Sequence, residues 1–266
     1  MAANPYSAAG SGLLSATQAW LAGWWQVVHL GALMLVLALS RSSHCGPRWP
    51  ALAAQLVRVC LPMLPGFTVV TALISLVIIR IVTVTALSYG LSQYALEMLV
   101  RVLVLELIPL AAALYAALRA TLPMASELAV LRQQGGFEVL HSQGRQPLID
   151  LVLPRVLAGM LAVMLLAALS AVLTLLLAYL SVHGFTLGGF EGFSRTVGRV
   201  FSPAVSLIFS LKVVLLGAAV TLIPLSAALH TGRRRGAWAS AELQSLLRMF
   251  IVMLGIEIAS LVGNYY

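Results

Sequence analysis

One long stretch without a charged side chain limits most strongly what this chain can fold into. From Val156 to Phe190 the sequence contains no Asp, Glu, Lys or Arg. As a single helix this stretch would be about 52 Å long, whereas the hydrocarbon core of a bilayer is about 30 Å thick. We therefore expect a transmembrane helix that ends near His183 and Gly184 and passes into a loop extending to Arg199.

The composition of the whole chain agrees with a membrane protein. The 266 residues are 61% hydrophobic and only 9% charged, with a mean hydropathy of +1.00. Soluble domains contain about 25% charged residues. Because the polar segments are too short to form an aqueous catalytic domain, the sequence predicts an all-α, polytopic membrane protein.

Five segments are apolar and long enough to cross a bilayer as helices. They are residues 61–89, 97–118, 156–182, 203–229 and 248–266. An earlier apolar segment, residues 12–40, has a weakly polar stripe at helical spacing and contains Trp20, Trp24 and Trp25. Tryptophan favours the headgroup level of a membrane. We expect an interfacial (elbow) helix here, with an ordinary first transmembrane helix as the alternative.

The positive charges indicate which ends of these helices face the cytoplasm. Segments 41–58, 119–155 and 231–248 contain three, four and four Lys or Arg residues, the last group including Arg233–Arg235, whereas the opposite side has four in total. Cytoplasmic loops are enriched in these residues. Orientation and anionic lipid therefore explain the net charge of +8, which does not indicate nucleic acid.

The polar segment 119–155 separates the second and third expected spans. Its first part, residues 126–134, is rich in good helix formers, and Gly135 and Gly136 interrupt it. Residues 137–143 have the pattern of a short amphipathic helix. We interpret the segment as a rigid element that a cytosolic motor grips, with a solvated loop that has no partner as the alternative.

The end of this polar segment has its own turn signals. Gly144 can end the short helix, Pro147 can begin the next one, and Pro154 is placed to kink that helix as it enters the membrane. A structural role in these turns is assigned to Gly135, Gly136, Pro147, Pro154 and Arg155. The residues expected to contact a partner are Phe137, Glu138 and Leu140.

Four charged residues lie inside otherwise apolar spans: Arg80, Glu106, Lys212 and Glu257. A charge at the centre of a bilayer costs about 2.5–3.5 kcal/mol on insertion scales, so these side chains should face the protein interior. A functional interpretation is a polar cavity that accepts the head groups of amphiphiles or an ion-pair lock between helices. The alternative is a structural interhelical pair, or an Arg or Lys side chain that snorkels to the membrane interface.

One face of the first expected span is a candidate lining for a lipid path. Ile78, Thr85, Ala86 and Tyr89 fall on it by helical spacing. Ordinary helix packing is the commoner explanation of such a stripe, and we keep it as the alternative. With Arg80 and Glu106 these residues form the predicted lipid cavity.

The sequence contains no pattern that carries catalysis. It has no phosphate-binding glycine loop, no zinc-ligand spacing and no paired nucleophile and base, so we predict no catalytic residue, metal or cofactor in this chain. Any energy for transport must then come from a partner chain.

The stretch from Glu106 to Arg155 contains a series of short motifs. They are Glu106-Leu107-Ile108-Pro109 with Ala111–Ala113, then Arg119, Glu127 and Arg132, then Pro147, and then Pro154-Arg155 followed by Ala158-Gly159. In this order and spacing the chain resembles the MlaE-type (YrbE-like) permeases of bacterial MCE lipid-transport ABC systems. The resemblance extends more loosely over residues 50–266.

The resemblance implies an ABC permease fold with an elbow helix and five transmembrane helices, paired with a second permease copy of the same or a different sequence. A cytosolic ABC ATPase, which binds ATP and Mg²⁺, would contact Glu127, Arg132, Phe137, Glu138 and Leu140. A periplasmic MCE-domain protein would sit on the outer face, and a STAS-domain protein would bind the ATPase. Phospholipid or another hydrophobic lipid would be the cargo, in a cavity between the two copies near Glu106, and the complex would lie in the bacterial inner membrane.

Two departures from the family pattern raise alternatives. The family's coupling motif E-Q-I-D-A-L reads Gly135-Gly136-Phe137-Glu138-Val139-Leu140 here, and Leu105 stands where relatives often have Arg, a charge that Arg80 is hypothesised to replace. The altered coupling motif suggests a membrane scaffold that no longer transports. Arg80, Glu106 and Lys212 suggest an ion-coupled secondary transporter, which the lack of an internal repeat disfavours.

Overall fold

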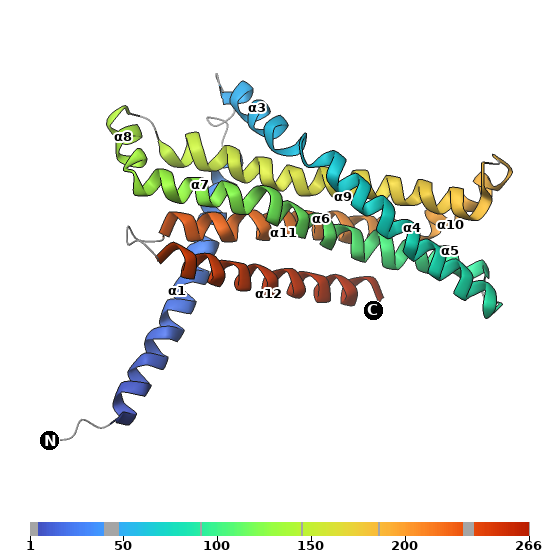
Figure 1. The fold of residues 1–266 in the computed structure, drawn as a ribbon, viewed down its shortest axis with the longest axis horizontal. Coiled ribbons are helices and arrows are strands. Elements are labelled where there is room, and N and C mark those ends of the chain that lie inside the picture. Colours follow the sequence, from blue (N-terminus) through green and yellow to red (C-terminus); the bar gives the residue numbers. More distant parts are fainter. Residues whose placement is uncertain are drawn as a thin grey trace.

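The computed structural model describes residues 5–39, 48–90, 92–144, 146–185, 187–230 and 237–265. Within these ranges every regular element is a helix, and the long helices lie side by side in one elongated bundle (Figure 1). The expected all-α architecture is confirmed. The Arg233–Arg235 triplet lies outside the described residues, and for residues 5–19 only the backbone is described.

The elements follow one another with short connections. In order they are α1 (Pro5–Leu39), α3 (Arg48–Cys60), α4 (Leu64–Ser88), α5 (Ser92–Leu99), η1 (Val100–Leu107), α6 (Ile108–Ala116), η2 (Ala117–Thr121), α7 (Leu122–Gln133), α8 (Gly136–Ser142), η3 (Leu148–Val152), α9 (Leu153–His183), η4 (Leu187–Gly189), α10 (Phe190–Val200), α11 (Pro203–His230) and α12 (Ala237–Tyr265). Here η1, η2 and η3 are π-helical turns, and η4 is a 3₁₀ turn.

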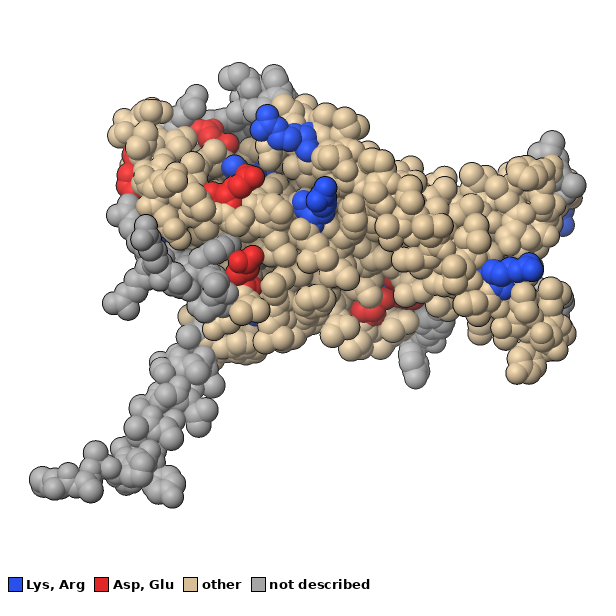
Figure 2. All heavy atoms as spheres, in the orientation of Figure 1, with Lys and Arg blue, Asp and Glu red and all other residues tan. Residues whose placement is uncertain are grey.

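Six helical segments are long and apolar enough to cross a membrane. They are Trp20–Leu37, Leu64–Ser88, Leu96–Gln133, Leu148–His183, Pro203–His230 and Glu242–Asn264. Most of the charged atoms on the face shown in Figure 2 lie toward the two ends of the bundle, and the surface between them is largely uncharged. This distribution is that of a multi-pass membrane protein.

The long helix that contains the expected span 97–118 extends further than this span. It runs without a loop from Ser92 to Gln133, so the first part of polar segment 119–155 is a continuation of the membrane helix. The physical reason is that residues 119–133 contain no glycine, and the first glycine that ends the helix is Gly135.

The helix α1 crosses the bundle at a steep angle instead of running along it (Figure 1). Leu30 and Met34 of α1 are buried against Leu225 near the end of α11 and Val156 near the start of α9. The crossing is therefore at the end of the bundle where α9 begins and α11 finishes. The assignment of residues 12–40 to an interfacial helix stays a prediction, since Trp20–Leu37 also has the length and hydropathy of a transmembrane span.

Three prolines inside the long helices each follow a π-helical turn. Pro109 comes two residues after the end of η1, Pro123 two residues after η2, and Pro154 two residues after η3. Proline lacks an N–H and its ring collides with the carbonyl four residues earlier in a regular α-helix. The wider π turn relieves this collision, so each helix continues through its proline.

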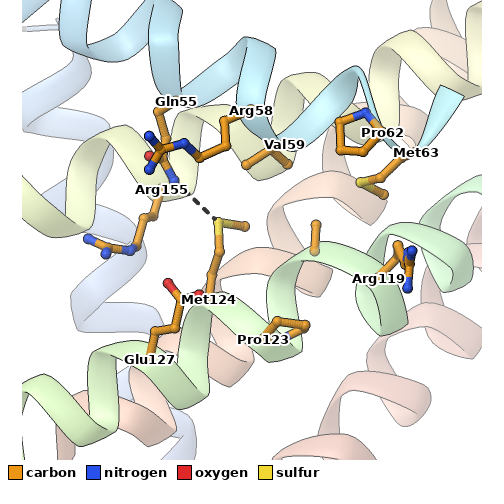
Figure 3. Close-up of a pocket in the computed structure, with 11 residues that line it drawn as sticks. Gln55, Arg58, Val59, Pro62, Met63, Arg119, Pro123, Met124, Glu127 and Arg155 are labelled. Carbon is orange, nitrogen blue, oxygen red and sulfur yellow. Dashed lines mark hydrogen bonds between the residues drawn. The ribbon is translucent and has the colours of Figure 1, made fainter.

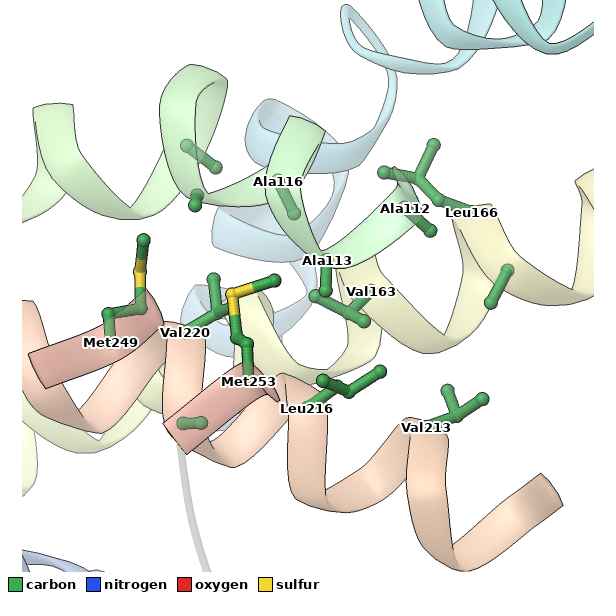
Figure 4. Packing of buried hydrophobic residues seen from close by; sticks show 14 of the residues in the cluster. Ala112, Ala113, Ala116, Val163, Leu166, Val213, Leu216, Val220, Met249 and Met253 are labelled. Atoms are coloured by element: carbon green, nitrogen blue, oxygen red, sulfur yellow. The ribbon is translucent and has the colours of Figure 1, made fainter. Parts of the chain in front are cut away.

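Small residues allow the central helices to pack closely. Ala112, Ala113 and Ala116 of α6 are fully buried against Val163 of α9 and Leu216 of α11 (Figure 4). In membranes, where lipid is as apolar as leucine, close packing of small residues is a main source of helix association. This contact fixes α6 between α9 and α11.

One glycine is required where α9, α11 and η2 meet. A Cβ atom on Gly159 would lie 2.3 Å from Cγ2 of Thr221 and 3.3 Å from Cγ2 of Thr121. The first distance is far shorter than a van der Waals contact, so no larger residue fits without a shift of the helices. The missing side chain at Gly159 therefore allows α9 to pack closely against α11 and against η2, which leads into α7.

Candidate functional site

The end of the bundle that α1 crosses is formed by a helical hairpin in which α7 and η3–α9 are joined through α8 (Figure 1). The helix–break–helix layout expected for residues 126–147 is observed. Gly135 has φ 78°, the left-handed conformation that ends α7, and Gly144 has φ 71° after α8. Such angles are strained for residues with a Cβ atom, so both turns depend on glycine.

The second glycine of the pair has a different role. A Cβ atom on Gly136 would lie 2.9 Å from Cγ of Leu131 and 3.0 Å from its carbonyl oxygen. The start of α8 therefore rests directly on the last turn of α7. The tight turn between these two helices requires the Gly135-Gly136 pair.

The side chains of α8 divide into an inward and an outward set. Phe137 is half-buried and packs on the hydrophobic cluster that includes Leu128 and Val152. Glu138 and Val139 are exposed, and Val139 exposes 56% of its surface. An exposed Val beside an exposed Glu at the tip of the hairpin offers a partner both an apolar and an acidic contact.

The remaining residues predicted to contact the ATPase lie around this hairpin. Leu140 of α8 is half-buried, Arg132 is half-buried in the last turn of α7, and Glu127 is exposed two turns before the end of α7. Arg155, assigned a structural role, donates a hydrogen bond from Nη1 to the carbonyl oxygen of Leu151 at 2.9 Å. The structure thus brings these residues to one end of the bundle without placing them all on one face.

Three of the four charges predicted inside the membrane form one cluster. Lys212 of α11 donates hydrogen bonds from Nζ to Oε2 of Glu106, to Oε1 of Glu257 at 2.9 Å and to the carbonyl oxygen of Leu105 at 3.1 Å. An ammonium group has three N–H donors, so this lysine is fully satisfied. Its side chain exposes only 1% of its surface. The geometry is that of the ion-pair lock.

The cluster also contains a residue that sequence reasoning did not single out. Asn264 of α12 donates from Nδ2 to Oε1 of Glu106 at 3.2 Å. Farther along this cluster, Oε2 of Glu257, Oγ of Ser260 and Oδ1 of Asn264 are buried and accept no hydrogen bond from the described residues. The spacing of 257, 260 and 264 places these three side chains on one face of α12, which is the signal that could have found them.

The predicted lipid-cavity residues are not brought together. Arg80 and Thr85 of α4 are exposed, and so is Tyr89 directly after this helix, which exposes 76% of its surface. Ile78 is half-buried in a hydrophobic cluster, and Ala86 is half-buried as well. The hydrogen bonds of Glu106 go instead to α11 and α12, as described above. The assignment of these residues to a lipid path stays a prediction.

The hypothesis that Arg80 replaces the missing arginine beside Glu106 gains no support. Arg80 is exposed on α4, and no ion pair between described residues includes it. The cation that neutralises Glu106 is Lys212. Its ammonium also donates a hydrogen bond to the carbonyl oxygen of Leu105.

Nothing among the described side chains resembles a metal centre or an activated nucleophile. No group of three or more His, Cys, Asp or Glu residues in the described ranges is placed to hold a metal ion. Burial raises the pKa of the Cys60 thiol, so this cysteine stays protonated at neutral pH.

Most of the chain matches the model of one known protein family. A family model described as permease MlaE matches residues 52–262. The match begins in α3 and ends in α12, so it includes the hairpin around α8 and the Lys212 cluster except for Asn264. No curated protein matches the chain.

Proposed function

The chain belongs to the MlaE permease family, and on this basis we propose that it is the transmembrane subunit of an ABC transporter that moves phospholipid or another hydrophobic lipid. The lipid passes between the bacterial inner membrane and a tunnel formed by a periplasmic MCE-domain protein. The energy comes from ATP hydrolysis, with ATP and Mg²⁺ bound by a cytosolic ABC ATPase. A STAS-domain protein is a further subunit on the ATPase.

The observation that carries this proposal is the hairpin tip at α8. A seven-residue helix projects from the bundle, held by Gly135 and Gly136 and anchored inward by Phe137. Its outward residues Glu138 and Val139 are exposed. A short helix that is rigidly attached to two membrane helices suits a contact through which a soluble motor moves the membrane part.

The lipid path is proposed to lie between this chain and a second permease copy, identical or different. The exposed face of α4 is almost entirely apolar and includes Val69, Leu73, Val77 and Leu87. Together with Thr85 and Tyr89 it offers a wall for acyl chains with polar groups near one end. The opposite end of the bundle from α8, which includes α10, is the proposed contact surface for the MCE-domain protein.

The experiment that tests this function is a charge reversal at α8. Glu138→Lys should lower co-purification with the ATPase and lower lipid-stimulated ATP hydrolysis, because it places a repelling charge in the proposed contact. Membrane insertion should be unchanged. The matched control is Glu191→Lys, the same change in the first turn of α10 at the other end of the bundle. Normal association of Glu138→Lys with the ATPase, or an equal loss of association in both variants, would contradict the assignment of α8 as the ATPase contact.

A membrane scaffold that no longer transports is the alternative, and the same preparation separates the two. A scaffold would form the complex without lipid-stimulated ATP hydrolysis, or would bind no ATPase. The altered coupling motif does not by itself favour the scaffold, because the tight turn accounts for both glycines. An ion-coupled transporter is weakened because Arg80 is separate from the Lys212 cluster; it would require transport that continues without an ATPase.

A further inference from the structure

A cavity opens between α3, η2–α7 and α9, beside the hairpin that carries α8. Its volume is about 340 Å³, and three arginines and one glutamate line it: Arg58, Arg119, Arg155 and Glu127 (Figure 3). In Figure 2 blue and red atoms surround a hollow at this end of the bundle. Three guanidinium groups against one carboxylate leave a net charge of +2 on the lining.

The arginines keep most of their hydrogen-bonding capacity. Neither Arg58 nor Arg119 has an ion-pair partner among the described residues. Arg155 uses Nη1 for the carbonyl of Leu151, and its Nε is buried with no partner in the described part of the chain. A guanidinium has five N–H donors in a planar fork that matches phosphate oxygens. A buried, unpaired donor of this kind favours an anion in the cavity.

The floor between the arginines is apolar. Val59 and Met63 line one side and Met124 the other, where Gln55 donates from Nε2 to Sδ of Met124 at 3.9 Å (Figure 3). Val57 of α3 and Leu61, which directly follows α3, are next to the cavity and expose more than half of their surface. In a membrane protein such exposed apolar residues face lipid. A phosphate group that reaches this cavity is therefore expected to belong to a lipid molecule.

We propose that this cavity binds a phosphate-bearing anion, held by Arg58, Arg119 and Arg155, and that its source is the headgroup of an anionic phospholipid in the cytoplasmic leaflet. Glu127 offsets one of the positive charges and borders the part of the cavity nearest Arg155 (Figure 3). The ligand would tie α3 to both long helices that flank α8. The proposal does not rest on transport, because any membrane protein with this cavity would bind the same ligand.

The test measures binding of lipid to the purified full chain in neutral detergent micelles. Phosphatidylglycerol is titrated, phosphatidylcholine is the neutral-headgroup comparison, and inorganic phosphate is a separate arm. Saturable binding of phosphatidylglycerol, followed by native mass spectrometry, is expected for the wild type. Arg58→Gln combined with Arg119→Gln should weaken it about a hundredfold, since the double variant removes two charge-assisted contacts and each contributes about tenfold to the affinity. Both side chains are exposed, so the double variant should fold.

The matched control removes the same two charges at the other end of the bundle. Arg195→Gln combined with Arg199→Gln, both exposed on α10, should leave the affinity unchanged. An equal loss in the control, or no saturable binding to the wild type, would overturn the site. Full competition by inorganic phosphate at millimolar concentration would support the anion site but overturn the lipid as its source. Arg155→Lys, which keeps the charge but removes the fork, should weaken phosphatidylglycerol binding by a smaller factor.

Discussion

Lys212 of α11 donates a hydrogen bond to Glu257 of α12 at 2.9 Å, and the same ammonium contacts Glu106 at the end of η1. One buried cation therefore links three membrane segments. Removing one partner of a buried ion pair leaves an uncompensated charge, whereas replacing the whole group by apolar residues is often neutral. This asymmetry makes the cluster testable.

Lys212→Met should lower the stability of the detergent-solubilised protein by about 3–5 kcal/mol, because two buried carboxylates lose their only shared cation. The midpoint of thermal unfolding measures the effect. Lys212→Met combined with Glu106→Gln and Glu257→Met removes all three charges and should recover most of the loss. If the single and triple variants unfold at the same temperature, uncompensated charge is not the cause of the lost stability.

Gly159→Ala should destabilise the protein by about 1–3 kcal/mol, because the new methyl group would lie 2.3 Å from Cγ2 of Thr221. Thr221→Ser removes that methyl and keeps the hydroxyl that donates to the carbonyl of Gly217 at 2.8 Å. The double variant should therefore be more stable than Gly159→Ala alone in thermal unfolding. Gly255→Ala, where no atom lies within 4 Å, is the control and should be neutral or slightly stabilising.

Gly135→Glu, which restores one residue of the family's coupling motif, should loosen the tip of the hairpin. The left-handed φ of 78° costs a residue with a Cβ atom about 1–2 kcal/mol. Faster hydrogen exchange of the amides in α8 is the expected readout, with α11 as the internal reference. Slower exchange in α8 would contradict this prediction, because it would mean that the new glutamate side chain forms a stabilising contact that outweighs the backbone strain.

The hydrogen bond between Ser75 of α4 and Thr174 of α9 should make a small, measurable contribution. The two hydroxyl groups are buried and lie 2.8 Å apart. Double-mutant cycles of such bonds in membranes average about 0.6 kcal/mol. A cycle of Ser75→Ala and Thr174→Val should give a coupling near this value. Additive effects would mean that each hydroxyl finds another acceptor, and Ser88→Ala, exposed on the same helix, should have no effect.

Much of the fold could be predicted because its signals are local. Charge-free length predicts the membrane helices, and Gly135, Gly144 and Pro147 predict the turns on either side of α8. The sequence does not predict that the second expected span continues to Gln133. Hydropathy falls after Leu118, whereas helix propensity stays high up to Gln133. The wide turns before Pro109 and Pro123 were missed for a related reason: a proline predicts a disturbed helix, but not whether the helix breaks or widens.

The site was less predictable because its contacts join distant parts of the chain. Glu106, Lys212 and Glu257 were each expected to face the interior, but their convergence on one ammonium depends on how α11 packs against α12. Asn264 and Ser260 were not predicted to belong to a site, because single polar residues near the end of a helix are common. The basic cavity needs Arg58, which the sequence placed in a polar link, to lie across from Arg119 and Arg155.

The continuous helices on both sides of α8 have a mechanical consequence. One runs from Gln133 back to Ser92 and the other from Leu148 to His183, each across the whole bundle without a loop. We expect them to act as two stiff rods that are joined at α8 and packed closely near Gly159. A displacement applied to α8 should then reach the opposite side of the membrane as movement of the rods themselves, with any bending at the wide turns before Pro109, Pro123 and Pro154.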